Sequence, residues 1–411
     1  MPKLLQIAIE SNKGSVGRIA EQIGETVIEN GWSSYVTYAR DSNPSTSEVI
    51  KIGSKWDVYL HGLETRIFDN HCFSSRSATK DFINTIKEIK PDIIHLHHLH
   101  GYFINIEILF QYLKESEIPV VWTFHDCWSF TGHCAHFDFV GCEKWKTQCH
   151  HCEQKNEYPK SLIFDRSRQN YIDKKRIFNS INNLTIVAVS NWLSGKVKES
   201  FLKDYPCEVI QNGIDLNTFS PKKSRAAIEE LYNVRGKFII LGVASTWDKK
   251  KGLEEFAKLS ELIDNNLYTI ILVGLSQKQI QKLPKSIIGI ERTENVGQLA
   301  DLYSAADVFL NPTFEDTFPT TNLESMACGT PVITYRTGGS VESVNEKTGV
   351  VVDKGDVPGL IIAMATIRNR GKDFYEQNCR AHAIEHFDRK IKFNDYVELY
   401  KNILKKKDGE Y

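Results

Sequence analysis

The sequence predicts an α/β protein built from two doubly wound domains. Short apolar runs alternate with helical patterns along almost the whole chain, and many of these runs are apolar at consecutive positions. Such runs are typical of parallel strands that helices cover on both faces. The pattern restarts near residue 237, and 411 residues are too many for one compact core. We therefore expect two domains that face each other across a cleft, where small-molecule sites are common.

The expected strands fall into an N-terminal and a C-terminal set. The N-terminal set comprises residues 4–9, 34–37, 93–96, 120–124 and 186–189. The C-terminal set comprises residues 238–243, 269–273, 287–290, 308–310 and 332–335. Because helical patterns separate successive strands, we expect the strands of each set to lie parallel in one sheet.

The domain boundary is expected in a segment rich in turn formers, Gln-Asn-Gly-Ile-Asp-Leu-Asn-Thr-Phe-Ser-Pro at 211–221. This linker would join an N-terminal domain of residues 1–210 to a C-terminal domain of residues 222–385. An irregular, cysteine-rich insertion is expected within the N-terminal domain at 127–160. Residues 386–411 carry apolar side chains at helical spacing, which predicts a C-terminal helix that packs back on the N-terminal domain.

Composition and charge narrow the class of protein. The formal net charge is −1, so nothing marks the whole chain as a nucleic-acid binder. No apolar run reaches the roughly 18 residues that a membrane-spanning helix needs, and the chain begins with a strand pattern instead of a signal peptide. We therefore expect a soluble, cytoplasmic protein. Lysines at 401 and 405–407 predict a solvated helix end or, alternatively, contact with an anionic membrane surface.

The segment 311–333 predicts an anion site between two carboxylates. A buried-looking strand leads into a loop with Glu315 and Asp316, and Pro319 then opens a helix. Free amides at a helix N-terminus bind anions. The residues of this first turn are Thr320, Thr321 and Asn322. Glu324 follows inside the helix, eight positions after Asp316. Anion-binding amides beside hydroxyl-binding carboxylates suit a sugar nucleotide.

Two other strand-to-helix loops have features of a phosphate site. Gly14, Ser15 and Gly17 follow the first strand and would let the backbone approach a ligand, although glycines in such turns also serve packing. Lys251 beside Gly252 follows the first strand of the C-terminal set. A lysine at this position suits a diphosphate leaving group, and the alternative is a solvated lysine cluster.

His125 directly follows a strand and precedes Asp126. Ligands of open α/β sheets bind at the carboxyl ends of the strands, where a histidine can donate a hydrogen bond to a substrate hydroxyl or phosphate. The preceding strand ends in the histidine-rich segment 95–101, in which any single histidine is more often structural than catalytic. We therefore single out His125 as the candidate catalytic histidine.

Four cysteines of the insertion have metal-ligand features. Their spacing is C-x7-C-x6-C-x2-C, at Cys134, Cys142, Cys149 and Cys152. Four thiolates in a short window can build a structural zinc site, but reduced, packed cysteines explain the same pattern equally well. The chain has nine cysteines, which in a cytoplasmic protein favour these two explanations over disulfides.

Together these segments resemble a retaining glycosyltransferase of the two-Rossmann GT-B type, family 4, and the resemblance covers nearly the whole chain. The segment 311–333 is its most specific part. The supporting motifs are Gly14-Ser-Val-Gly17, His125-Asp126, Val189-Ser-Asn-Trp192, Asn212-Gly-Ile-Asp215, Lys251-Gly252 and Leu302-Tyr-Ser-Ala-Ala-Asp307. The segment 315–324 and the cysteine-rich insertion are similar to those of enzymes of bacterial capsule and exopolysaccharide assembly.

The resemblance implies roles for individual residues. Its Glu-x7-Glu motif maps onto Asp316, for the transferred sugar, and Glu324, for the donor ribose, with Glu315 as the alternative first carboxylate. Lys251 matches a phosphate-binding lysine. The usual arginine would fall at Ser245 or Thr246, so that Lys249, Lys250 or the helix amides must replace it. The implied catalytic residues are His125, Lys251, Asp316 and Glu324. The implied donor-binding residues are Gly14, Ser15, Gly17, Thr246, Lys250, Arg292, Glu315, Phe318, Thr320, Thr321 and Asn322.

The resemblance also implies partners. The C-terminal domain would bind a UDP- or GDP-linked sugar, and the N-terminal domain a saccharide or lipid-linked acceptor, which would bring the enzyme to the inner face of the membrane. Transfer would need no catalytic metal or other cofactor, so any zinc would be structural. Two alternatives remain open: a sugar-nucleotide epimerase or phosphorylase on the same fold, and a non-catalytic zinc-containing binding protein.

Overall fold

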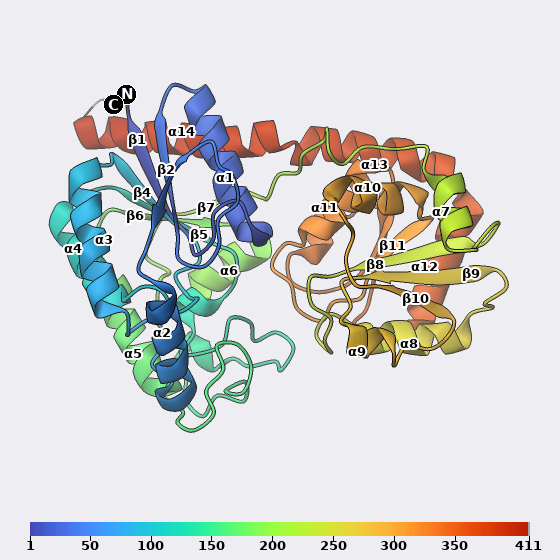
Figure 1. Cartoon of the computed structure of the whole chain (residues 1–411), viewed down its shortest axis with the longest axis horizontal. Coiled ribbons are helices and arrows are strands. Elements are labelled where there is room, and N and C mark those ends of the chain that lie inside the picture. The colour runs from blue at the N-terminus through green and yellow to red at the C-terminus, as the bar shows by residue number, and fades with distance from the viewer. Residues whose placement is uncertain (410–411) are drawn as a thin grey trace. The chain divides into compact units, whose positions relative to one another are not determined.

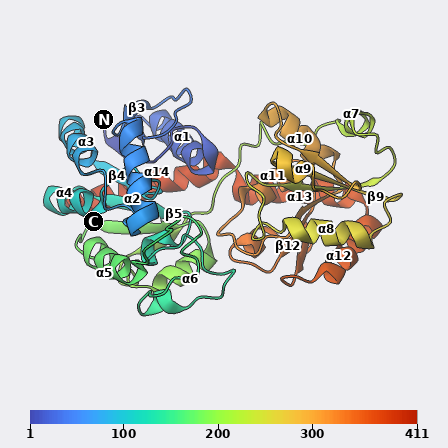
Figure 2. The same cartoon turned by 60° about the horizontal axis from the view of Figure 1, so that its bottom comes forward.

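A computed structural model describes residues 1–409 and divides the chain into two compact units (Figure 1, Figure 2). The N-terminal unit comprises Met1–Gln211 and the C-terminal segment from Lys390, and the C-terminal unit comprises Asn212–Arg389. Each unit contains one wholly parallel sheet between helices, as the sequence predicts. None of the described helices is long and apolar enough to cross a membrane.

The N-terminal sheet has seven strands in the order β3-β2-β1-β4-β5-β6-β7. They are β1 (Lys3–Ile7), β2 (Ser33–Tyr38), β3 (Glu48–Lys51), β4 (Ile93–Leu96), β5 (Val120–Phe124), β6 (Leu184–Ala188) and β7 (Cys207–Val209). The helices are α1 (Gly14–Glu29), α2 (Lys55–Phe68), α3 (Arg76–Ile89), α4 (Ile106–Ser116), α5 (Ser167–Phe178), α6 (Asn191–Glu199) and α14 (Arg389–Asp408), with 3₁₀ turns at Trp128–Phe130 and Lys144–Lys146. Side-chain caps from Ser54, Asn105 and Ser190 begin α2, α4 and α6.

The C-terminal sheet has six strands in the order β10-β9-β8-β11-β12-β13. They are β8 (Phe238–Val243), β9 (Tyr268–Val273), β10 (Ile287–Ile290), β11 (Val308–Asn311), β12 (Val332–Tyr335) and β13 (Gly349–Val352). The helices are α7 (Arg225–Leu231), α8 (Leu253–Leu262), α9 (Gln277–Ile280), α10 (Val296–Ala305), α11 (Thr320–Ala327), α12 (Val357–Arg370) and α13 (Lys372–Phe387), with a 3₁₀ turn at Ser340–Ser343.

The sequence misses three strands, and each lies at a sheet edge. All the expected strands are present, but β3, β7 and β13 are additional. Most residues of β3 are exposed, and β7 has three residues without a buried position. An edge strand packs against one neighbour only, so β3 and β7 lack the apolar runs on which the sequence prediction depends.

Helix α14 packs against the N-terminal sheet (Figure 1). Phe393, Tyr396, Val397 and Tyr400 share a buried cluster with side chains of α1, β1, β4, β5 and β6. The hydroxyl of Tyr400 lies 2.7 Å from Nδ1 of His95 in β4. The end of the chain therefore completes the core of the first unit.

The segment expected to be a linker belongs instead to the C-terminal unit from Asn212 onward. The amide of Ile214 donates to the carbonyl of Phe387, and the Arg389 amide donates back to Ile214. Phe219 is buried, and the Arg380 guanidinium donates to its carbonyl at 2.8 Å. Turn-forming residues predict local bends, but these non-local contacts decide to which unit the segment belongs.

Candidate active site

Two loops at the carboxyl edge of the C-terminal sheet contain the predicted site residues Lys250, Lys251, Glu315 and Asp316. One connects β8 to α8, and the other connects β11 to α11. The Phe314 amide donates to the carbonyl of Lys250 at 2.7 Å, and the Thr313 hydroxyl reaches the same carbonyl at 3.3 Å. Gly252 has φ +76°, and a Cβ there would clash with the carbonyl of Pro312. These contacts hold the two loops together, which brings their charged side chains within reach of each other.

Two ion pairs connect the loops. Lys250 Nζ lies 2.8 Å from Glu315 Oε1, and Lys251 Nζ lies 2.7 Å from Asp316 Oδ2. The Glu315 side chain is 4% exposed and that of Asp316 is 17% exposed, so Asp316 is the more accessible carboxylate. Burial disfavours the charge on Lys251, but the Asp316 carboxylate beside it raises its pKa above the ordinary value. Lys251 is therefore a cation at neutral pH.

Glu324 is oriented by a tyrosine of the neighbouring helix. The hydroxyl of Tyr303, in α10, donates to Glu324 Oε2 at 3.0 Å. Burial and the adjacent carboxylate raise the pKa of Tyr303, so its hydroxyl keeps its proton. Glu324 itself is partly exposed. Tyr303 thus holds the carboxylate of a residue that is not fully buried.

Asn322 points into the protein and fixes the start of α11. Its side-chain amide donates to the hydroxyls of Ser340 and Ser343, both at 3.1 Å, and its Oδ1 accepts from Asn311 at 2.9 Å. Its backbone amide donates to the carbonyl of Pro319 at 3.2 Å. The amides available for an anion at this helix start are therefore reduced to those of Thr320 and Thr321.

Three predicted donor residues are not members of these ion pairs. Phe318 is 3% exposed and packs on Phe387, although its amide donates to Asp316 Oδ1 at 3.3 Å. Thr246 is exposed in the loop after β8. Arg292 is exposed after the edge strand β10, which β9 and β8 separate from β11.

The structure adds a turn that the sequence reasoning missed. After β12, the Gly339 amide donates to the carbonyl of Asp316 at 3.2 Å. Gly338 has φ +47°, and a Cβ there would clash with the same carbonyl oxygen. The hydroxyl of Thr337 is buried and has no hydrogen-bond partner within residues 1–409. Two consecutive glycines at the end of a predicted strand were the available signal for this turn.

The glycines of the first turn of α1, which follows the loop after β1, have a packing reason. Gly14 has φ +66°, and a Cβ on Gly17 would lie 2.9 Å from the carbonyl oxygen of Glu10. Ser15 is exposed. A role in ligand binding therefore stays a prediction for all three of these positions.

His125 lies at the carboxyl edge of the N-terminal sheet, in a chain of side-chain contacts. Its Nε2 is 3.2 Å from Nδ1 of His97, and His97 Nε2 is 3.0 Å from Oε1 of Gln6 in β1. Burial lowers the pKa of His125 to about 3. The imidazole is thus neutral at neutral pH and can donate or accept a hydrogen bond but supplies no positive charge.

The four cysteines of the insertion line one small cavity. Its volume is about 20 Å³, and the cysteines that line it are Cys134, Cys142, Cys149 and Cys152. All nine cysteines are free thiols. A hydrogen bond from Cys134 lowers the pKa of Cys152 to about 7, whereas burial raises the pKa of Cys149 to about 12. Within residues 1–409, no three of the sulfurs come within 4.8 Å of one another, so the thiols share a cavity without the spacing of a closed metal site.

Comparison with known families accounts for both units. The family described as Glycosyltransferase Family 4 matches residues 16–218, and the family described as Glycosyl transferases group 1 matches residues 237–369. The first match lies within the N-terminal unit except at its end, and the second within the C-terminal unit.

Individual proteins are similar to this chain as well, one relative and one solved structure over nearly its whole length. A protein of Escherichia coli (strain K12) named as the colanic acid biosynthesis glycosyl transferase WcaC is 23% identical, over 97% of this chain and 100% of its own. An Escherichia coli UDP-Gal:alpha-D-GlcNAc-diphosphoundecaprenol alpha-1,3-galactosyltransferase is 23% identical over 50% of this chain and 56% of its own. Among solved structures, sucrose-phosphate synthase from Thermosynechococcus elongatus has a TM-score of 0.72 at 18% identity, covering 98% of this chain and 99% of its own. With both family domains present and a GT-B fold along its length, the chain belongs to the glycosyltransferases of family 4.

Proposed function

We propose that the protein transfers a sugar from a UDP- or GDP-linked donor to a saccharide or lipid-linked acceptor in polysaccharide biosynthesis, with retention of configuration. The observation that carries the proposal is the pair of lysine–carboxylate contacts between the β8 and β11 loops, next to the N-terminus of α11. Cations, carboxylates and helix amides together match a diphosphate joined to two sugars. The names of the relatives, which refer to colanic acid and to a UDP-Gal donor, support the same class of reaction.

The ion pairs suggest how the donor is recognised. A diphosphate that contacts Lys251 competes with Asp316 for the ammonium and releases the carboxylate toward hydroxyls of the transferred sugar. We assign the role of the missing arginine to Lys250 instead of Lys249, because the Lys249 side chain is 76% exposed and pairs with Glu254. Glu324, held by Tyr303, binds the ribose hydroxyls.

Chemistry then depends on charge stabilisation. The acceptor hydroxyl attacks on the face from which the nucleoside diphosphate leaves, and a donor phosphate oxygen takes its proton. Charge grows on the diphosphate in the transition state, where Lys251 and the amides of Thr320 and Thr321 stabilise it. His125, as a neutral imidazole, donates a hydrogen bond to a substrate hydroxyl.

A panel of nucleotide sugars tests this function. Incubation with UDP-, GDP- and ADP-sugars, scored by thermal shift and by slow hydrolysis, should identify one nucleotide that stabilises the protein and one sugar that is released. An epimerase would convert the donor without an acceptor, and a phosphorylase would require inorganic phosphate. No stabilisation by any of these nucleotides would contradict the transferase and leave a non-catalytic binding protein.

Replacing Asp316 by Asn should separate sugar transfer from nucleotide binding. Turnover should fall about 10–150-fold, the equivalent of one charge-assisted hydrogen bond of about 1.5–3 kcal/mol. Lys251 loses its partner in the same variant, so the affinity for the nucleoside diphosphate alone should be kept or increase. Initial rates and calorimetric binding measure the two effects.

The matched control is Glu315→Gln. The Glu315 side chain is more deeply buried than that of Asp316. This variant should therefore lower the thermal midpoint but change turnover little. Loss of turnover confined to Glu315→Gln would instead make Glu315 the first carboxylate of the site.

We also propose that Cys134, Cys142, Cys149 and Cys152 bind one structural zinc ion. The proposal is supported by the cavity that these thiols line, which also contains the buried imidazole of His133, and binding would have to draw the four sulfurs closer together. His133 Nδ1 is 2.6 Å from Asp69 Oδ1, and its Nε2 has no hydrogen-bond partner in the described part of the chain. A histidine fixed by a carboxylate through one nitrogen is typical of the surroundings of zinc.

Elemental analysis tests the zinc site. The purified protein should lose about one equivalent of zinc when Cys134 and Cys152 are both replaced by Ser, and its thermal midpoint should fall. Cys207→Ser, at the strand β7, is the matched control and should change neither. Equal zinc content in all three proteins would leave packed thiols as the explanation.

We propose finally that helix α2 contacts the inner face of the membrane, where a lipid-linked acceptor is found. Four side chains of this helix form an exposed apolar stripe at helical spacing. They are Trp56 (73% exposed), Tyr59 (61%), Leu60 (53%) and Leu63 (43%). The stripe continues at Phe68, whose ring stacks on that of Phe164, next to exposed Leu162 and Ile163. An outward apolar stripe of this size favours an interface. Helix α14, which contains the lysines at 405–407, lies at the opposite edge of this unit from α2 in Figure 1.

Vesicle sedimentation tests the α2 surface. Binding to phosphatidylglycerol vesicles should weaken at least about tenfold, or about 1.4 kcal/mol, when Trp56 and Leu60 are replaced by Ser. Ile362→Ser, a single exposed apolar residue of α12, is the matched control. Loss of binding only after replacement of the lysines at 405–407 would assign the contact to α14.

A further inference from the structure

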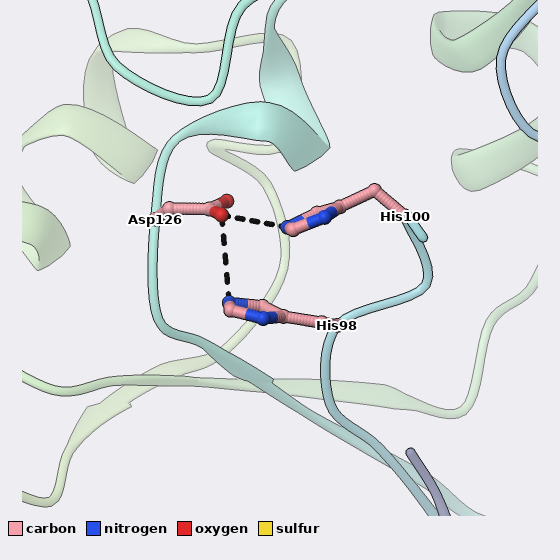
Figure 3. A group of neighbouring side chains, drawn as sticks. All are labelled: His98, His100 and Asp126. Atoms are coloured by element: carbon pink, nitrogen blue, oxygen red, sulfur yellow. Dashed lines mark hydrogen bonds and ion pairs between the residues drawn. The ribbon is translucent and has the colours of Figure 1, made fainter. Parts of the chain in front are cut away.

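Three potential metal ligands converge at the carboxyl edge of the N-terminal sheet. His98 and His100 follow β4, and Asp126 follows the adjacent strand β5. Figure 3 shows both imidazoles directed at one oxygen of the carboxylate. His100 Nε2 lies 2.7 Å and His98 Nε2 lies 3.4 Å from Asp126 Oδ2. The three atoms lie within 4.8 Å of one another, the spacing of ligands around one ion.

Neighbouring groups fix two of these side chains in this orientation. The Trp128 amide donates to Asp126 Oδ1 at 2.9 Å, which leaves Oδ2 for the histidines. The Tyr158 hydroxyl is 2.9 Å from His100 Nδ1, which directs Nε2 toward the carboxylate. Metal-ligating histidines are held in this way through their second nitrogen. Tyr158 belongs to the cysteine-rich insertion, so the insertion helps to shape this cluster.

Hydrogen bonding alone leaves one of the imidazoles unsatisfied. His100 donates to Asp126 Oδ2, but His98 Nε2 is buried and has no hydrogen-bond partner within residues 1–409. A buried nitrogen without a partner destabilises a protein, because its interaction with water is lost and nothing replaces it. A cation between the three atoms would accept both nitrogen lone pairs and one carboxylate oxygen, which would remove this cost.

The geometry points to a binding site for one divalent transition-metal ion, formed by His98 Nε2, His100 Nε2 and Asp126 Oδ2. Two imidazoles and a carboxylate suit Zn²⁺ and similar ions, whereas Mg²⁺ and Ca²⁺ prefer oxygen ligands. Binding requires His100 to carry its proton on Nδ1, and the Tyr158 hydroxyl can accept that hydrogen bond as well as donate one. Three protein ligands leave one coordination position of the ion open. The ring centroid of His125 lies 5.2 Å from that of His98.

Cobalt is the probe that distinguishes this site from the cysteine cavity. Co²⁺ bound by thiolates gives a sulfur-to-metal charge-transfer band, which imidazole and carboxylate ligands do not produce. Metal-stripped, full-length protein with Cys134→Ser and Cys152→Ser should bind one equivalent of Co²⁺ with ligand-field bands and no charge-transfer band. No binding of Co²⁺ or Zn²⁺ to this protein at millimolar concentration would overturn the proposal.

Variants in the same background assign the ligands. His98→Ala and Asp126→Asn should each weaken binding at least about 100-fold, and Tyr158→Phe about 10–100-fold, because it only orients His100. His386→Ala, an exposed histidine of α13, is the matched control and should have no effect. Unchanged binding in His98→Ala would overturn the site.

If a ligand variant fails to fold, the site can still be tested by a spectroscopic measurement on a protein that keeps all its histidines. Circular dichroism in the presence of EDTA identifies such a variant. X-ray absorption of the zinc-loaded Cys→Ser protein should then show nitrogen and oxygen ligands with imidazole scattering. Absence of imidazole scattering would overturn the proposal.

Discussion

Every strand pair in both sheets is parallel, and this constraint determines where the chemistry of the chain can lie. Parallel strands end at a common edge, so loops that follow adjacent strands meet there. Strands β8 and β11 are neighbours, and the loops after them bring Lys250 and Lys251 to Glu315 and Asp316. Strands β4 and β5 are neighbours too, and the loops after them bring the histidines to Asp126. Both clusters arise from the same topology.

The two clusters differ in electrostatics. In the C-terminal unit Glu315 and Asp316 each have a lysine partner. In the proposed mechanism an incoming anion takes over the lysine, and the carboxylate turns to a hydroxyl. The site thus contains charges of both signs, and the charges of each pair largely cancel. In the N-terminal unit burial lowers the pKa of His125, so that this imidazole beside Asp126 offers neutral nitrogen atoms. Neutral nitrogen lone pairs suit a cation or a hydroxyl better than a phosphate.

The cysteine-rich insertion helps to position the cluster of His98, His100 and Asp126. Trp145 stacks on Phe137, and buried Lys174 of α5 donates to the carbonyls of Trp128 and Thr131. From this framework Tyr158 reaches His100. A long irregular loop needs such anchors to stay ordered. An ion bound by its thiols would therefore stabilise the position of Tyr158 as well as the loop.

The sequence by itself determined the α/β class, the two sets of strands and the placement of Glu315, Asp316 and Glu324 around a helix start. These features depend on periodicity and on turn and cap residues, which act over a few positions. Only the tertiary structure decided that the chain after Asn212 joins the C-terminal unit and that Asn322 points inward. It alone paired each lysine with a carboxylate and brought His98, His100 and Asp126 together. Those outcomes depend on which strands are neighbours and on contacts between residues far apart in the chain, which local patterns do not encode.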